Sequence, residues 1–357
     1  MTRIEDLIEK PSVWLRREGP ESDVVLASRV RLSRNLTRHR FPGTATEDQR
    51  RDILSRVADA SQDLELLNGG LRLDLDDLEA SGRRVLAERQ LAPVAILAEA
   101  PLRQLFVSSD ESGGFLVNGE DHLHFQSQRS GLDLEAAFET CDTLDVEMDS
   151  RLDFAYSETY GFLTARPTRS GTGMRASALM HLPGLLLRET FDETVAALRR
   201  QKVLVEGFWL DGVRSDAHLF LVSNAATLGQ REGEIIHDLD AAVRELLEQE
   251  LEARQELLSG AQSLLADRIW RSYGILSQAR LLKARETLHH TTRLLLGMQL
   301  GILSIPTNVL VELFSLSQEA HSKLLMQTNT TDRETTDQEV EEWRAERVRN
   351  ELQGLNS

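Results

Sequence analysis

Alternation of apolar and polar residues predicts strands in the first two thirds of the chain. The clearest example is Val24–Leu32, a β-branched and apolar run of suitable length that ends in alternation from Arg29 to Leu32. Three short runs then follow one another with turn residues between them, which is typical of an antiparallel meander: Gln104–Ser109, Gly114–Asn118 and Leu123–Ser127. Further predicted strands are Tyr160–Thr164, Val203–Leu210 and Ala217–Val222.

Apolar residues at helical spacing predict helices between these strands and dominate the last third of the chain. The character of the sequence changes between Gln249 and Gly260. After this boundary the pattern is entirely helical and leucine-rich, with one break at Pro306. We therefore predict an α+β core over residues 1–254 and an all-helical region over 255–357, with a loose polar segment at 329–338. The predicted helices are Thr46–Leu67, Asp76–Leu91, Asp133–Met148, Met174–Leu187, Asp192–Arg200, Gly233–Leu258 and Glu339–Leu352.

Composition narrows the class of protein. The formal net charge of −17 argues against general nucleic-acid binding, which requires a basic surface. The one cysteine, Cys141, permits no internal disulfide and suits a reducing compartment. No run of about 18 apolar residues is present, so we expect no membrane span. We expect a cytoplasmic protein in which the sequons at Asn35 and Asn329 carry no glycan.

Two arginines share one face of the first predicted strand. Strand alternation places Arg29 and Arg31 side by side, where their charges repel unless an anion or an acidic partner lies between them. Arginine suits bidentate phosphate contact, so the pair predicts a phosphate site. The alternative is a solvated strand face with Asp or Glu partners.

A glycine-rich turn predicts a second anion site. Gly171 and Gly173 precede the predicted helix Met174–Leu187, and Arg175 would lie in its first turn. Free amides and the dipole at a helix N-terminus favour a phosphate there. A tight loop without function is the alternative interpretation of these glycines.

Adjacent acids supply the remaining candidate chemistry. Glu120 and Asp121 are flanked by His122 and His124 at a strand junction, which indicates either a hydrogen-bonded turn or a carboxylate site. Their spacing matches no metal motif, so we predict no metal site. Several arginines around a polyphosphate, with a carboxylate opposite to hold a guanidinium acceptor, would support phosphoryl transfer.

Together these motifs resemble those of the ATP:guanido phosphotransferases, and within that family the bacterial protein arginine kinases. The resemblance covers most of the chain and includes Ser28–Asn35, Glu120–His122, Gly171–Ser177, Ser223–Asn224 and Arg271–Leu276. It implies a phosphagen-kinase-like core with an antiparallel sheet flanked by helices. It further implies ATP with Mg²⁺, arginine-containing protein substrates, an activator protein, and a homodimer formed through the helical region.

The resemblance also implies roles for individual residues. Glu120 matches the carboxylate that acts on the guanidinium, and Asp211 falls where the family has a second acid. The implied nucleotide-binding positions are Ala27, Ser28, Arg29, Val30, Arg31, His124, Arg175, Ala176 and Ser177.

Five positions depart from the family's pattern and give a degenerate active site. Arg166 replaces the catalytic Cys and Arg169 replaces an Asn, while the family's Arg, His and Arg are here His124, Gln90 and Glu206. Arg166 would either enter the acceptor pocket or face the phosphates. Near the C-terminus, the family's phosphoarginine-binding motif retains only Arg344 and Ala345.

Three functions follow from this pattern. The first is an ATP-dependent kinase of protein arginines. The second is a pseudokinase that has lost turnover and acts as a binding or adaptor protein. The third is a small-metabolite guanidino kinase, which the helical region disfavours because it resembles that of the protein-directed branch.

Overall fold

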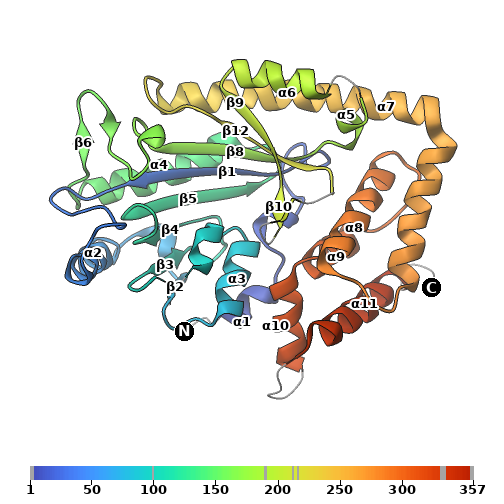
Figure 1. Ribbon diagram of the computed structural model, residues 1–357, viewed down its shortest axis with the longest axis horizontal. Helices are drawn as coiled ribbons and strands as arrows, with labels where there is room; N and C mark the ends of the chain where they lie inside the picture. The colour runs from blue at the N-terminus through green and yellow to red at the C-terminus, as the bar shows by residue number, and fades with distance from the viewer. Residues whose placement is uncertain are drawn as a thin grey trace.

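An eight-stranded antiparallel sheet forms the centre of the molecule (Figure 1). The computed structural model describes residues 4–98, 100–188, 191–210, 213–214, 217–329 and 335–353. Every neighbouring strand pair runs antiparallel, which confirms the predicted sheet and its meander. In spatial order the strands are β2 (Leu71–Asp74), β3 (Gln104–Val107), β4 (Gly113–Val117), β5 (Leu123–Ser130), β1 (Val25–Arg34), β8 (Met174–His181), β12 (Leu219–Asn224) and β9 (Val203–Gly207).

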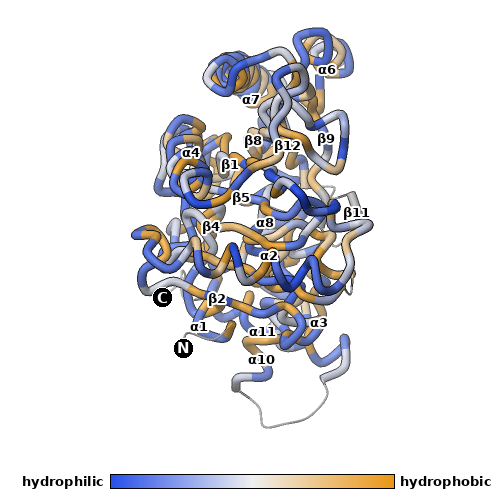
Figure 2. The backbone as a smooth tube through the Cα atoms, turned by 90° about the vertical axis from the view of Figure 1, so that its left-hand side faces the viewer, coloured by the Kyte–Doolittle hydropathy of each residue, from blue (hydrophilic) through white to orange (hydrophobic). Residues whose placement is uncertain are grey.

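Helices cover the sheet and continue beyond it. The helices α4 (Leu134–Asp149) and α7 (Glu232–Gln278) contribute apolar side chains to the main core, together with the central strands. In Figure 2 the helices change repeatedly between polar and apolar positions, as expected for helices with one buried face. The other helices are α1 (Ile4–Ile8), α2 (Glu47–Ala60), α3 (Ala80–Glu88), α5 (Pro183–Leu186), α6 (Phe191–Arg200), α8 (Ala284–Gln299), α9 (Thr307–Leu316), α10 (Glu319–Asn329) and α11 (Asp337–Gln353).

One predicted helix is wrong. The segment Met174–Leu187 forms strand β8 over Met174–His181, and only the four-residue α5 follows it. Pairing with β1 on one edge and β12 on the other supplies the backbone hydrogen bonds of β8, and all its side chains except Arg175 are buried. This tertiary environment overrides the helical preference of Met, Ala and Leu.

Other boundaries shift without changing the type of element. The predicted helix at Thr46 does begin there, because Thr46 and Gln49 form a reciprocal capping box, but it ends at Ala60. A separate 3₁₀ turn follows at Glu65–Leu67. Short additional elements are the 3₁₀ turns Val13–Leu15, Val94–Leu97 and Pro167–Arg169 and the strands β6 (Tyr156–Ser157), β7 (Gly161–Phe162), β10 (Trp209–Leu210) and β11 (Val213–Arg214).

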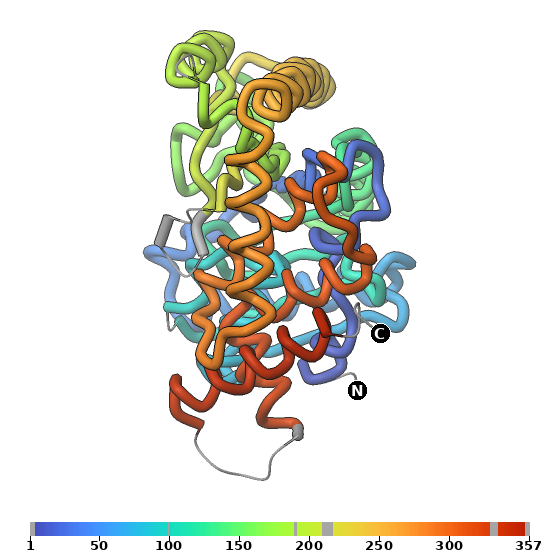
Figure 3. Tube along the Cα trace, turned by 90° about the vertical axis from the view of Figure 1, so that its right-hand side faces the viewer, coloured from blue at the N-terminus to red at the C-terminus, as the bar shows by residue number. Residues whose placement is uncertain are grey.

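Helix α7 bends at Ala261, whose backbone is non-helical (φ −142°, ψ 32°). Its first part runs alongside the sheet next to β8 and β12 (Figure 1), and its second part descends along the side of the molecule beside the C-terminal helices (Figure 3). The predicted boundary at residue 254 therefore lies inside one helix. A second buried cluster crosses that boundary, because Trp14 and Leu179 pack with Ile269 and Leu295. No helix in the described ranges is long and apolar enough to cross a membrane.

A buried ion pair joins α7 to the sheet. The carboxylate of Glu250 accepts hydrogen bonds from the amides of Gly184 (2.9 Å) and Leu185 (2.8 Å) at the start of α5, and from Arg254 Nε (2.6 Å). Arg254 Nη2 in turn donates to the carbonyl of His181 at the end of β8 (2.8 Å). Burial raises the pKa of Glu250, whereas Arg254 and the two amides lower it. The carboxylate therefore depends on these partners to carry its charge.

We predict that Arg254→Ala lowers the free energy of unfolding by about 3–5 kcal/mol, because it leaves the buried Glu250 carboxylate uncompensated. Urea denaturation followed by circular dichroism measures this loss. Arg244→Ala is the matched control, since Arg244 and Asp240 form an exposed pair with the same spacing on the same helix, and we expect it to cost no more than about 0.5 kcal/mol. Equal losses in the two variants would contradict the role assigned to the buried pair.

Candidate active site

Strand β1 places its two arginines on one face, as predicted. Arg29 and Arg31 are half-buried and line a cavity of about 260 Å³ together with Gln90, Glu206 and Phe208. Arg31 also lines an adjoining cavity of about 170 Å³, which reaches Glu120. Arg31 therefore lies where the two cavities meet, and Arg29 lies in the first of them.

Arg31 lacks a counter-ion among the residues that the structure describes. Its Nε is buried without a hydrogen-bond partner. Burial and, secondarily, the neighbouring Arg175 and Arg169 lower the pKa of Arg31 to about 10. Burial also lowers the pKa of Arg29, with further contributions from Arg31 and Arg175. Because like charges are held together here with little compensation, the cavity is suited to an anion, and the alternative of a solvated strand face with acidic partners fails for Arg31.

Arg175 lies directly across from Arg31, on the neighbouring strand β8. Its Nη2 donates to Glu206 Oε2 (3.0 Å) and to Ser223 Oγ (3.0 Å). Glu206 comes from strand β9, and its side chain is 54% exposed. A phosphate that binds Arg175 therefore competes with a carboxylate that the protein itself supplies.

The reason for glycine in the Gly171–Gly173 turn differs from the predicted one. It leads into a strand, so no helix N-terminus lies at this place, and the predicted helical anion cradle is wrong. Gly173 has φ +65°, and a Cβ on it would lie 2.7 Å from the carbonyl oxygen of Ser33. The turn is held against β1 by Arg34 Nη1, which donates to the carbonyl of Thr172 (2.8 Å). Glycine is required here for close approach of the backbone to β1.

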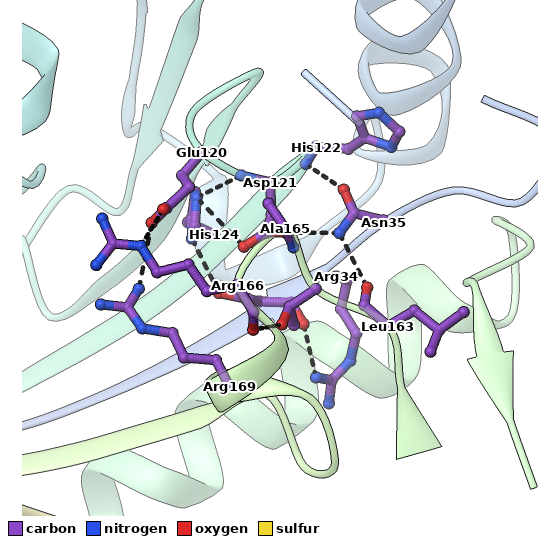
Figure 4. A network of polar contacts seen from close by, with 12 residues as sticks. Arg34, Asn35, Glu120, Asp121, His122, His124, Leu163, Ala165, Arg166 and Arg169 are labelled. Atoms are coloured by element: carbon purple, nitrogen blue, oxygen red, sulfur yellow. Dashed lines mark hydrogen bonds and ion pairs between the residues drawn. The ribbon is translucent and has the colours of Figure 1, made fainter. Parts of the chain in front are cut away.

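The two adjacent acids have different roles. Asp121 is buried, and its Oδ1 accepts hydrogen bonds from Asn35 Nδ2 (2.7 Å) and from the amide of Ala165 (2.6 Å) (Figure 4). It therefore fixes the loop that contains residue 165 against β1. Glu120 points the other way, into the cavity, and is the acid available for chemistry. Asn35 is itself buried in this network and donates to the carbonyl of Leu163 as well.

Two guanidinium groups of the protein contact Glu120. Arg166 Nε donates to Glu120 Oε1, and Arg169 Nη1 lies 3.5 Å from Glu120 Oε2 (Figure 4). The side chains of Arg166, Arg169 and Glu120 are 60%, 33% and 32% exposed. Of the two orientations considered for Arg166, the structure shows contact with the carboxylate that the resemblance assigns to the acceptor.

His124 lies between the arginines and Glu120 as a neutral side chain. Burial lowers its pKa to about 4, with Asp121 opposing this shift and Arg31 adding to it. Its Nε2 accepts from the amide of Asp121 (3.0 Å), so the proton belongs on Nδ1, which faces Ser33 Oγ (3.1 Å). His124 therefore adds no positive charge at neutral pH where the family has an arginine.

The other predicted positions lie around this centre. Ala27, Ser28, Val30 and Ala176 are buried, and the Ser28 hydroxyl is hydrogen-bonded to the backbone of Gly131 and Asp133. Ser177 Oγ faces the carbonyl of Arg29 (3.5 Å), so the part of these residues in nucleotide binding stays a prediction. Asp211 lies outside the described residues. Within the described ranges no cluster of three His, Cys, Asp or Glu could hold a metal.

Sequence reasoning missed the supporting residues. Asn35 positions Asp121, and Ser33 orients His124. Ser33 continues the alternation of Arg29 and Arg31 along β1, so strand periodicity could have identified it. Asn35 belongs to the motif Ser28–Asn35 and to a sequon, but its role in holding Asp121 was not predicted, because its partners lie 86 and 128 residues away in the chain.

Comparison with solved structures defines the class of the fold. The crystal structure of lombricine kinase matches with a TM-score of 0.59 and 22% identity, covering 67% of this chain and 68% of that one. The duplicated taurocyamine kinase from Schistosoma mansoni matches with a TM-score of 0.60 and 23% identity over 74% of this chain and 38% of that one. The architecture is that of the phosphagen kinases.

Sequence comparison specifies the family further. The model of the ATP:guanido phosphotransferase C-terminal catalytic domain matches residues 52–253, and that of the protein-arginine kinase McsB C-terminal domain matches residues 262–357. The protein-arginine kinase of Halothermothrix orenii is 37% identical over 327 residues, covering 90% of this chain and 93% of that protein. That of Bacillus subtilis is 34% identical over 310 residues, covering 86% and 85%. The chain belongs to the ATP:guanido phosphotransferase family, among the protein-arginine kinases.

We predict opposite effects of Arg31→Met on stability and on binding. Removal of a buried charge without a partner should raise the unfolding temperature of the ligand-free protein by about 2–4 °C, equivalent to ~1 kcal/mol after allowance for partial solvent exposure. The same change should weaken ATP binding about 30-fold, because a charged hydrogen bond to phosphate is worth roughly 2 kcal/mol.

Differential scanning fluorimetry and isothermal titration calorimetry measure the two effects. Arg72→Met is the control, because Arg72 is an exposed arginine of the same sheet on strand β2, and we expect no change in ATP affinity. Unchanged ATP affinity in Arg31→Met would remove Arg31 from the phosphate site.

Proposed function

We propose that this protein transfers the γ-phosphoryl group of ATP to the guanidinium group of arginines in protein substrates. One observation carries the proposal: a half-buried arginine without a counter-ion, Arg31, lies where two adjoining cavities meet, and the second cavity contains Glu120. The arginines suit the phosphates, and the carboxylate suits a cationic acceptor. A site that offers both at opposite ends matches the two substrates of this reaction.

In the proposed reaction Arg29, Arg31 and Arg175 bind the phosphates and stabilise the charge that spreads over the transferred group. Glu120 orients the acceptor guanidinium and takes one of its protons. The bond between the γ-phosphorus and the bridging oxygen breaks, ADP leaves with that oxygen, and a phosphorus–nitrogen bond forms. Arg166 must leave Glu120 for the acceptor to bind there, and we propose Asp211 as a second acid at the acceptor.

The remaining assignments are also proposals. Magnesium would enter with the nucleotide, as the resemblance to the ATP:guanido phosphotransferases implies. We propose a catalytic core over residues 1–254 and a helical region over 255–357 that forms a homodimer, supported by the exposed apolar residues Leu264, Trp270 and Ile275 on α7. We further propose a cytoplasmic location, in keeping with a single buried cysteine, and regulation by an activator protein.

We predict that the protein forms acid-labile phosphoarginine on an arginine-rich protein in the presence of ATP and magnesium, detected by mass spectrometry under neutral conditions. Glu120→Gln should lower the rate at least about 100-fold, because it removes the proton acceptor. Glu65→Gln is the control, since Glu65 is an exposed carboxylate in a surface 3₁₀ turn, and should leave the rate unchanged.

Calorimetric ATP binding without any phosphoarginine would contradict the kinase proposal. That result would favour the alternative of a binding or adaptor protein that retains the fold.

A further inference from the structure

The cavity of about 170 Å³ that contains Glu120, here called the acceptor cavity, has more cationic than anionic side chains available for pairing at its mouth. Arg166 and Arg169 share the single carboxylate of Glu120. The other acids that line the two cavities are engaged elsewhere: Glu206 pairs with Arg175, and Glu88 accepts from the amides of Ala320 and His321. Asp121 is buried and bonded to Asn35 and Ala165. Within the described part of the chain, no spare carboxylate lines these cavities.

The lack of a second carboxylate affects Arg166 and Arg169 when an acceptor binds. Under the proposed function, an incoming guanidinium takes Glu120, and Arg166 and Arg169 lose their counter-ion. Arg169 is half-buried, and burial together with Arg166 and Arg175 lowers its pKa, whereas Glu120 raises it. Loss of Glu120 therefore leaves two neighbouring cations that repel each other at the cavity mouth.

The released arginines would remain at the mouth, because the backbone around them is fixed. The amide of Ala165 donates to the buried Asp121, and Thr164 Oγ1 donates to the carbonyl of Arg166 (2.7 Å). Residues Pro167–Arg169 form a 3₁₀ turn directly after these contacts. The two side chains can swing away from Glu120, but their starting points stay beside the acceptor.

We propose that Arg166 and Arg169 select acceptor arginines that have an acidic residue beside them in the substrate. The acidic neighbour replaces Glu120 as counter-ion while the acceptor guanidinium occupies Glu120, so both ion pairs exchange partners without loss. This preference is opposite to what the net charge of −17 would produce, since an acidic protein attracts basic substrates in general. The inference rests on the proposed kinase function and adds the class of acceptor.

The test uses two unstructured polypeptides that each contain a single arginine, flanked by Asp in one and by the neutral isostere Asn in the other. Phosphoarginine formation gives kcat/KM for each. For the native protein we expect the Asp acceptor to exceed the Asn acceptor about two- to fivefold, the size expected for one partly exposed ion pair. In Arg166→Gln/Arg169→Gln the ratio should fall to near one, with the rate on the Asn acceptor increased.

Two controls separate selection from general charge effects. Arg166→Lys keeps the cation and should keep most of the preference. Arg244→Gln removes the same charge from an exposed pair on α7, outside both cavities, and should leave the ratio unchanged.

Equal kcat/KM values for the two acceptors with the native protein, or an unchanged ratio in the double variant, would overturn the inference and leave the kinase function standing. Absence of phosphoarginine on either acceptor and on an arginine-rich protein would overturn the kinase function and this inference together.

Discussion

Repulsion between arginines that two neighbouring strands hold over one cavity is the constraint on which this site depends. Register between β1 and β8 places Arg31 opposite Arg175, and Arg29 lies two residues before Arg31 on the same face of β1. Sheet pairing fixes the backbone of these arginines close together, and burial with the neighbouring arginines lowers the pKa values of Arg29 and Arg31. Stabilising contacts elsewhere in the fold offset the cost of this repulsion. An anion that binds here relieves the repulsion, and this relief contributes to its affinity.

The protein balances this charge with its own side chains at both ends of the site. Glu206 pairs with Arg175 where a phosphate would bind, and Arg166 pairs with Glu120 where the resemblance places an acceptor guanidinium. Glu206 has the negative charge of the phosphate that would replace it, and Arg166 has the positive charge of the guanidinium that would replace it. Binding of both substrates is then an exchange of ion pairs, in which the net gain depends on how well each ligand outcompetes a resident side chain.

Much of the fold and part of the site follow from local sequence patterns. Alternation in Val24–Leu32 predicted β1 and the shared face of Arg29 and Arg31, because side-chain direction in a strand is set by period alone. The segment Met174–Leu187 was mistaken for a helix because its pairing with β1 and β12 is not visible in the segment itself. Local sequence alone did not separate Glu120 from Asp121, and only the family resemblance singled out Glu120. Their different roles arise from Asn35 and Ala165 on one side and Arg166 on the other.

The central claim is that phosphates occupy the arginine cluster while an acceptor guanidinium displaces Arg166 from Glu120. A crystal structure with ADP, magnesium, nitrate and an arginine-containing peptide tests it most directly, because nitrate imitates the planar phosphoryl group in transfer. We predict that Arg31 contacts the nitrate, that the peptide guanidinium lies on Glu120, and that Arg166 has moved away from that carboxylate. Arg166 still bonded to Glu120, with the peptide bound elsewhere or absent, would contradict the account.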